Sequence, residues 1–252
     1  MKYFLDIAYN GSNYHGWQVQ QNAHTVQQEL NNALKKLFQQ TVETLGSGRT
    51  DTGVHAAQQF VQIELDKELS EELIFKLNCI LPNDIIIKDF FKVRDDASAR
   101  FDAVSRTYHY KICPLKDPFH RGLAYLFYKE LNMEKMNKAA KILFKYKDFQ
   151  AFSKVKTSVD HFLCDIMKAE WKKKNGLLVF EIEANRFLRG MVRSIVGTLI
   201  EVGLGRMSLT GFEKIIQGKS RMEAGRSVPA EGLYLIKIKY PKRVFLRKSN
   251  SK

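Results

Sequence analysis

The sequence is poor in cysteine. Its three cysteines, Cys79, Cys113 and Cys164, are odd in number and far apart, and none belongs to a C-x-x-C pair. A disulfide scaffold needs cysteines that can pair, and a structural zinc site needs four ligands at short, regular spacing. The cysteine pattern therefore argues against both kinds of protein.

Long apolar segments are also missing. The N-terminus reaches Asp6 before any apolar run of membrane-spanning length, and Arg or Lys interrupts the most apolar later segments. A signal peptide and a membrane span both require such a run. We therefore expect neither, and we expect a cytoplasmic protein.

Several common catalytic and nucleotide-binding motifs do not occur. There is no G-x-x-x-x-G-K-[ST] loop, no G-x-G-x-x-G after a predicted strand and no H-E-x-x-H helix. Neither a Ser-His-Asp order nor a pair of closely spaced carboxylates presents itself. Bound nucleotide and catalytic metal are therefore disfavoured, and any enzymatic activity has to depend on a single carboxylate.

What the sequence does have is positive charge and enough apolar residues for a core. Forty-one Lys and Arg residues outweigh twenty-seven Asp and Glu, which gives a formal charge of +14, and 44% of the residues are hydrophobic. Such an imbalance raises the local concentration of polyanions, so nucleic acid is the leading class of partner. A soluble basic protein with no nucleic-acid partner is the alternative on charge alone.

Hydrophobic periodicity predicts alternating strands and helices in the first half of the chain. Thr25 and Gln28 have the spacing of a capping box at the start of the first helix. The predicted elements are a strand over 2–10, a helix over 25–38, a strand over 57–66, a helix over 70–81 and a buried strand over 85–93.

The second half repeats this pattern. Asn175-Gly176 is the preferred two-residue turn of a type I′ hairpin. The predicted elements are a strand over 106–112, a helix over 132–146, a hairpin over 164–184, a helix over 187–202, a short helix capped by Ser208 and closed by Gly218, and a last strand over 233–240.

Each half thus mixes three or four strands with two helices in ferredoxin-like order. We expect an α+β protein of two ferredoxin-like halves, residues 1–100 and 101–241, that share an extended antiparallel or mixed sheet with helices on one face and a basic central cleft. The join near 94–100 is too short for a free linker. The basic tail 242–252 is short of core signals, so we expect it to be mobile or to face nucleic acid.

The stretch GSGRTDTGVHA, residues 46–56, places Asp51 in a glycine-rich loop after the first helix. An Asp between glycines often only caps a turn through its own backbone. The same carboxylate can instead act as a nucleophile or as a general base. The loop alone leaves both interpretations open.

Two further patterns accompany that carboxylate. Arg189 and Arg193 are four residues apart in an otherwise apolar predicted helix, where they either meet an anion or extend to the surface. Tyr108 and Tyr110 alternate with basic residues in RTYHY, which suits either stacking on bases or a structural role.

The motifs together resemble the TruA-type tRNA pseudouridine synthases in order and spacing, from Asp6 to about Tyr240. GRTD-x-GVHA with a downstream F-x-R-x-MVR is highly specific. The stretches that carry the resemblance are GSGRTDTGVHA, HGWQVQ, LPNDI, ARFDAVSRTYHY, DFQAF, NRFLRGMVRSIVGTLIEVG and PAEGLYL.

This resemblance implies roles for five residues. Asp51 matches the essential aspartate of GRTD, and Arg193 matches the arginine that pairs with it. Tyr108 matches the tyrosine that packs against the target base, and Leu233 matches an apolar residue of the same pocket. Arg49 matches the arginine linked to flipping the target uridine out of its stack.

The resemblance also implies the reaction and the partners. The family isomerises uridine to pseudouridine at positions 38, 39 and 40 of the tRNA anticodon arm, as a homodimer and without metal or other cofactor. Departures from the family pattern are few. Asn10 stands where Asp is common, Ser47 stands where Ala usually precedes GRTD, and Ser227-Val228 precede PAEGL.

Two rival functions come from other classes. A non-catalytic RNA-binding or RNA-folding protein would keep the basic cleft but lack turnover, and intact Asp51, Tyr108 and Arg193 argue against it. A basic DNA-binding dimer would need a recognition helix or a basic zipper, and the sequence shows neither.

Overall fold

The structure is a computed structural model, and it describes residues 1–155 and 159–246. This part of the chain forms an α+β fold with nine strands and five α-helices, and its strand pairing is mixed. The α+β class predicted from the sequence is confirmed. The chain divides into two compact units, Met1–Val104 with the segment that begins at Leu235, and Ser105–Tyr234.

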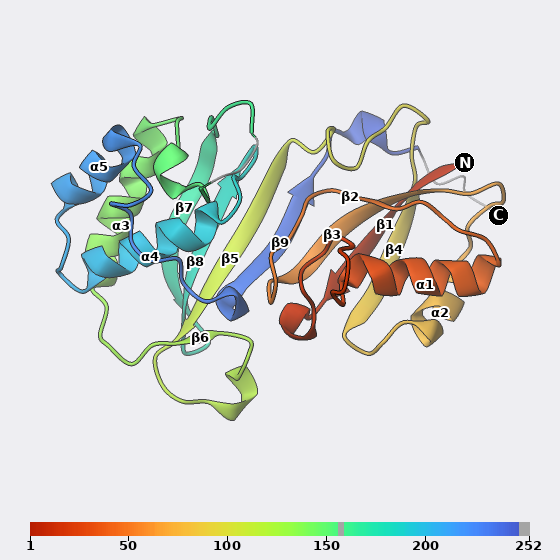
Figure 1. The fold of residues 1–252 in the computed structure, drawn as a ribbon, viewed down its shortest axis with the longest axis horizontal. Helices are drawn as coiled ribbons and strands as arrows, with labels where there is room; N and C mark the ends of the chain where they lie inside the picture. Colours follow the sequence, from red (N-terminus) through yellow and green to blue (C-terminus); the bar gives the residue numbers. More distant parts are fainter. Residues whose placement is uncertain (156–158, 247–252) are drawn as a thin grey trace. The chain divides into compact units, whose positions relative to one another are not determined.

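The first unit has a sheet in which β1 lies between β3 and β4, antiparallel to both. A short strand, β2, pairs with the other edge of β3. Helices α1 and α2 contact each other, and Figure 1 shows them side by side along the sheet. The bounds are β1 Lys2–Tyr9, α1 Val26–Phe38, β2 Leu45–Gly46, β3 His55–Glu64, α2 Glu71–Ile80 and β4 Ile85–Lys92.

Side-chain caps set the starts of these helices, and the cap at Thr25 was predicted from the sequence. The Thr25 hydroxyl accepts a hydrogen bond from Gln28 N at 3.4 Å, and the Ser70 hydroxyl accepts one from Leu73 N at 3.3 Å. Each cap satisfies a backbone N–H group that the helix itself leaves without a partner. The α1 helix ends at Gln39, whose φ of 57° is left-handed.

The C-terminal segment belongs to the core of the first unit. The Phe245 ring lies 5.4 Å from that of Phe91 and 5.9 Å from that of Tyr240, Val244 is buried, and Leu246 N donates to Lys92 O. The prediction of a mobile tail is therefore wrong for residues 242–246. Residues 247–252 lie outside the described part.

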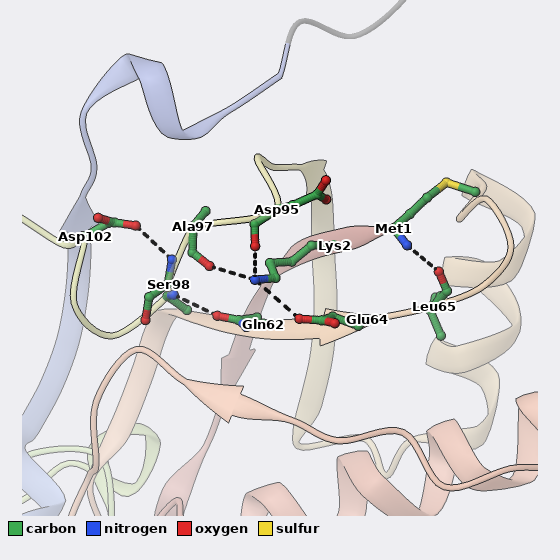
Figure 2. Close-up of polar contacts among 10 residues, drawn as sticks. Met1, Lys2, Gln62, Glu64, Leu65, Asp95, Ala97, Ser98 and Asp102 are labelled. Atoms are coloured by element: carbon green, nitrogen blue, oxygen red, sulfur yellow. Dashed lines mark hydrogen bonds and ion pairs between the residues drawn. The ribbon is translucent and has the colours of Figure 1, made fainter.

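The segment that leads out of the first unit is tied to its sheet (Figure 2). The Lys2 ammonium group donates to the backbone oxygens of Asp95 and Ala97 and lies 3.3 Å from a Glu64 carboxylate oxygen. Ser98 N donates to the Asp102 carboxylate at 2.8 Å. These contacts agree with the expectation that residues 94–100 are not a free linker.

The second unit has a sheet in the order β5-β8-β7, antiparallel throughout, to which β6 adds a short parallel pairing with β5. Helix α3 contacts α4, α5 and β7. Strand β9, Leu233–Lys239, runs from this unit into the first. The other bounds are β5 Ser105–Cys113, β6 Tyr125–Leu126, α3 Met133–Ile142, β7 Ile166–Lys174, β8 Leu177–Ala184, α4 Met191–Gly203 and α5 Leu209–Gly218.

The turn between β7 and β8 has the predicted conformation. Asn175 has a φ of 50° and Gly176 a φ of 79°, and a type I′ turn requires positive φ at both central residues. The hairpin expected over 164–184 is confirmed.

Three helix boundaries differ from the prediction. Helix α3 ends at Ile142 rather than near 146, because Leu143–Lys145 form a tighter 3-10 turn. Helix α4 begins at Met191 rather than near 187, because Gly190 has a left-handed φ of 73° that cannot continue a helix backwards. Arg189 therefore precedes the helix and is exposed. The short helix α5 is closed by Lys219, with a φ of 56°, and not by Gly218.

No helix within residues 1–155 and 159–246 is long and apolar enough to cross a membrane.

Candidate active site

Asp51 opens a tight turn at the end of the loop before β3. Asp51 O accepts a hydrogen bond from Val54 N at 3.1 Å, and Gly53 supplies the left-handed φ of 75° inside the turn. The neighbouring Thr50 is buried, Asp51 itself is half-buried and Arg49 is exposed. The carboxylate is thus presented from a fixed backbone while keeping access to solvent.

The backbone of residues 11–17 holds this turn in place. Trp17 N donates to Thr50 O at 3.2 Å, and Gly53 N donates to Tyr14 O at 3.1 Å. Two glycines allow the backbone of residues 11–17 to lie close to the backbone of the Asp51 turn. A Cβ at Gly16 would lie 2.4 Å from Thr50 O, and a Cβ at Gly11 would lie 2.0 Å from Val54 O.

Buried side chains add three further contacts around the turn. The Tyr9 and Thr50 hydroxyls are 2.9 Å apart. Gly11 N donates to His55 Nδ1 at 3.1 Å, so that ring nitrogen is an acceptor. The Ser47 hydroxyl accepts from Phe60 N at 3.2 Å. The polar groups that surround the turn are therefore paired.

Arg193 lies in the first turn of α4 and is half-buried. Its Nε donates to Val228 O at 2.7 Å, while Val228 N donates to Arg193 O at 3.2 Å. Because Nε is used in this way, any further hydrogen bond of the guanidinium is donated by its Nη groups. The interpretation of Arg193 as a surface arginine is not supported, whereas Arg189 is exposed.

The two tyrosines of β5 have different environments. Tyr108 is half-buried, and its ring meets Phe187 edge-on at 5.2 Å. Tyr110 is fully buried and donates to Pro229 O at 2.8 Å, and burial raises the pKa of its phenol. The buried Tyr110 therefore cannot stack on a base and has a structural role. Stacking on a base remains a hypothesis for Tyr108.

Leu233 begins β9 and is buried, directly after a short helical turn, Ala230–Gly232. A Cβ at Gly232 would lie 2.7 Å from the Tyr110 ring, so the chain passes tightly over that ring before it reaches Leu233. The position of Leu233 thus depends on the packing of Tyr110.

The five candidate residues divide between the units. Asp51 and Arg49 belong to the first unit, and Tyr108, Arg193 and Leu233 belong to the second. Within the second unit, residues 228–233 connect Arg193, the strand of Tyr108, and Leu233.

Sequence reasoning missed Thr198, whose hydroxyl accepts from Gly225 N at 3.0 Å beside this connection. Its partner is a backbone N–H group, so no sequence motif indicated this contact.

The chemistry open to this arrangement is that of a carboxylate. Asp51 can attack an electrophilic carbon or accept a proton. Across the described ranges, no three or more His, Cys, Asp or Glu side chains gather where they could hold a metal ion.

A family model described as tRNA pseudouridine synthase matches residues 7–102 and 139–241. This match includes Asp51 and the whole of α4.

Individual relatives are similar in sequence over nearly the whole chain. The tRNA pseudouridine synthase A of Porphyromonas gingivalis is 46% identical, over 97% of this chain and 99% of the relative. That of Bacteroides thetaiotaomicron is 45% identical, over 97% of this chain and 92% of the relative, and that of Thermoanaerobacter pseudethanolicus is 40% identical, over 93% and 97%. The chain therefore belongs to the tRNA pseudouridine synthase A (TruA) family of isomerases.

Proposed function

We propose that this protein isomerises uridine to pseudouridine at positions 38, 39 and 40 of the tRNA anticodon arm, with Asp51 as the catalytic residue. The bond from uracil N1 to the ribose C1′ breaks, and a bond from C5 to the same carbon forms. C5 loses one proton and N1 gains one, so nothing is oxidised or reduced and no cofactor is needed.

The observation that carries the proposal is the setting of Asp51. Its turn is held by the backbone of residues 11–17, and the polar neighbours of the turn are paired. A half-buried carboxylate on so fixed a backbone is preorganised to attack or to accept a proton. A carboxylate that only capped its own turn would not require this framework.

The other four residues have supporting roles in the proposal. Arg193 would pair with Asp51 through its Nη groups, which keeps the carboxylate charged and aimed. Tyr108 would pack against the target base above Leu233. Arg49, which is exposed beside Asp51, would contact the RNA while the uridine is flipped out.

The proposal extends to the architecture and the assembly. The two units would be ferredoxin-like halves that share one sheet, and a basic cleft between them would unite the five residues. The net charge of +14 would hold the tRNA phosphates. The protein would act as a homodimer in the cytoplasm, as the family resemblance implies.

The test uses unmodified tRNA transcript with tritium at uracil C5. Wild-type protein should release tritium to water, because C5 must lose its hydrogen to bond to the sugar. Asp51→Asn keeps the shape of the side chain and removes its charge, so release should fall by at least about 10²- to 10⁴-fold while tRNA binding stays within a few-fold. Asp66→Asn, at an exposed carboxylate of the same unit, is the matched control.

Full activity of Asp51→Asn would rule out the catalytic assignment. Tight tRNA binding by wild type without any tritium release from several good transcripts would favour the non-catalytic RNA-binding protein instead.

A further inference from the structure

The face of α4 that carries Arg193 is covered by the segment 225–229, which precedes Leu233. Arg193 and Gly197 are four residues apart on the helix, and so are Ser194 and Thr198, which makes all four neighbours on one face. Arg193 donates to Val228 O, the Thr198 hydroxyl accepts from Gly225 N, and Gly197 lies against Arg226 O. Ser194 O accepts a hydrogen bond from the Thr198 hydroxyl. The segment thus follows this helix face for more than one turn.

Two glycines let the two backbones touch. A Cβ at Gly197 would lie 1.9 Å from Arg226 O, and a Cβ at Gly225 would lie 2.8 Å from Thr198 N. Any side chain at either position would have to displace backbone. Helix α4 and the segment are therefore packed closely enough that neither glycine has room for a side chain.

The hydroxyl of Thr198 fixes where the segment lies along the helix. It accepts a hydrogen bond from Gly225 N at 3.0 Å and donates one to Ser194 O at 2.8 Å. Thr198 is fully buried, so no water replaces these bonds when the hydroxyl is removed. Arg221, which precedes the segment, supports its start by donating to Ala224 O, Gly225 O and the Ser227 hydroxyl.

The other end of the segment is fixed by the buried Tyr110, which donates to Pro229 O at 2.8 Å. Between the two ends lies Val228, whose carbonyl oxygen receives Arg193 Nε at 2.7 Å. The Val228 oxygen thus helps to orient the guanidinium, and this oxygen lies between the contact of Thr198 on one side and the contact of Tyr110 on the other.

We propose that Thr198 and Tyr110 are positioning residues for Arg193, acting through the 225–229 segment and the Val228 carbonyl. Neither touches the substrate. Their importance for catalysis rests on the proposed function, in which Arg193 aims the Asp51 carboxylate. Loss of either contact lets Val228 O move, and the guanidinium then loses the bond that orients its Nη groups.

The experiment compares four variants of the full-length protein. Thr198→Val removes the hydroxyl and keeps the branched shape, and Thr198→Ser restores the hydroxyl. Tyr110→Phe removes the contact to Pro229 O. Tyr146→Phe is the matched control, because its hydroxyl bonds to Glu213 and Gln217 in the same unit and has no contact with the segment.

Two measurements are made on each variant. The first is tritium release from C5-labelled tRNA under saturating and subsaturating conditions, which separates kcat from KM. The second is the solvent exchange of the Arg193 Nε–Hε group by NMR on protein with labelled arginine, with the signal assigned by Arg193→Lys. The second readout reports the bond to Val228 O whether or not the protein turns over.

We expect Thr198→Val to lower kcat about 10-fold and Tyr110→Phe about 3-fold with KM little changed, since small displacements of aligned groups are costly. Both should speed exchange of the Arg193 Nε–Hε group, while Thr198→Ser and Tyr146→Phe should stay within about 2-fold of wild type. If Thr198→Val does not fold, the test compares Tyr110→Phe, which removes a contact to the segment, with Thr198→Ser, which keeps the hydroxyl.

Unchanged Nε–Hε exchange in both Thr198→Val and Tyr110→Phe would overturn the positioning role, whatever happened to kcat. Faster exchange with unaltered kcat would also overturn it, since the segment would then hold Arg193 without serving catalysis. Absence of tritium release from wild type would instead count against the proposed function, and the exchange data would still decide whether the segment orients Arg193.

Discussion

The turn of Asp51 in the first unit and the 225–229 segment in the second are both built on glycines that let backbones touch, but they are held by different atoms. Around Asp51, backbone groups donate to backbone oxygens, from Trp17 to Thr50 and from Gly53 to Tyr14. Around the 225–229 segment, the side chains of Thr198, Arg193 and Tyr110 make the main contacts.

This difference predicts how each region responds to substitution. Contacts between backbone atoms survive most side-chain changes and fail where a side chain is forced into the space of a glycine. Contacts made by buried side chains fail when a single hydroxyl is removed. The carboxylate proposed to be catalytic therefore depends mainly on backbone contacts, whereas the arginine proposed to aim it depends on individual polar atoms.

The largest effect on stability is expected at Gly16. Gly16→Ala would place a Cβ 2.4 Å from Thr50 O on a residue with a φ of 91°, which combines a clash with backbone strain. We expect a loss of about 2–3 kcal/mol in the free energy of unfolding, measured with urea, and a lower kcat.

Gly48→Ala is the control within the same loop, because a Cβ there would meet nothing within 4 Å. Its stability should stay within about 0.5 kcal/mol of wild type. Equal stability of the two variants would contradict the view that the Asp51 turn is fixed by backbone contact.

A smaller effect is expected at Ser47, whose buried hydroxyl accepts a hydrogen bond from the backbone of β3. Ser47→Ala would leave Phe60 N without its 3.2 Å acceptor, at a cost of about 1 kcal/mol in the free energy of unfolding. Thr52→Ala, at an exposed position of the same loop, should change it by less than about 0.5 kcal/mol. A Ser47→Ala protein as stable as wild type would show that the loop does not depend on this hydroxyl.

Local sequence signals predicted the elements whose ends are fixed locally. Thr25, Ser70 and Ser208 each cap a helix with their own hydroxyl, and Asn175-Gly176 forms the expected turn. In all four cases the deciding interaction joins residues within three positions of each other, so it can be recognised in a short window.

The errors occur where distant residues decide the structure. Phe245 packs among aromatic residues of β1 and β4, more than 150 positions earlier in the chain, and no periodicity in the tail predicts that contact. The sequence left open whether Tyr110 faces RNA or is structural, and its bond to the distant Pro229 decides for the structural role.

The same limit applies to the candidate site. Motifs indicated Asp51 and Arg193 because their chemistry demands particular residue types. They did not indicate Thr198, because its partner is the backbone N–H of Gly225, and a backbone group leaves no trace in the sequence.

The smallest expected effect is on the pH dependence of the free energy of unfolding. It tests the side-chain contact that Tyr110 makes with the 225–229 segment. Burial raises the pKa of this phenol above its ordinary value of 10. A group whose pKa is raised by folding contributes its full stability below the unfolded pKa, so this contribution is present below pH 10 and is lost as the pH rises further. Urea unfolding between pH 9 and 11 should show a steeper fall in stability for wild type than for Tyr110→Phe. Identical slopes for the two proteins would mean that Tyr110 does not keep its proton in the folded state, and that its bond to Pro229 O cannot anchor the 225–229 segment at alkaline pH.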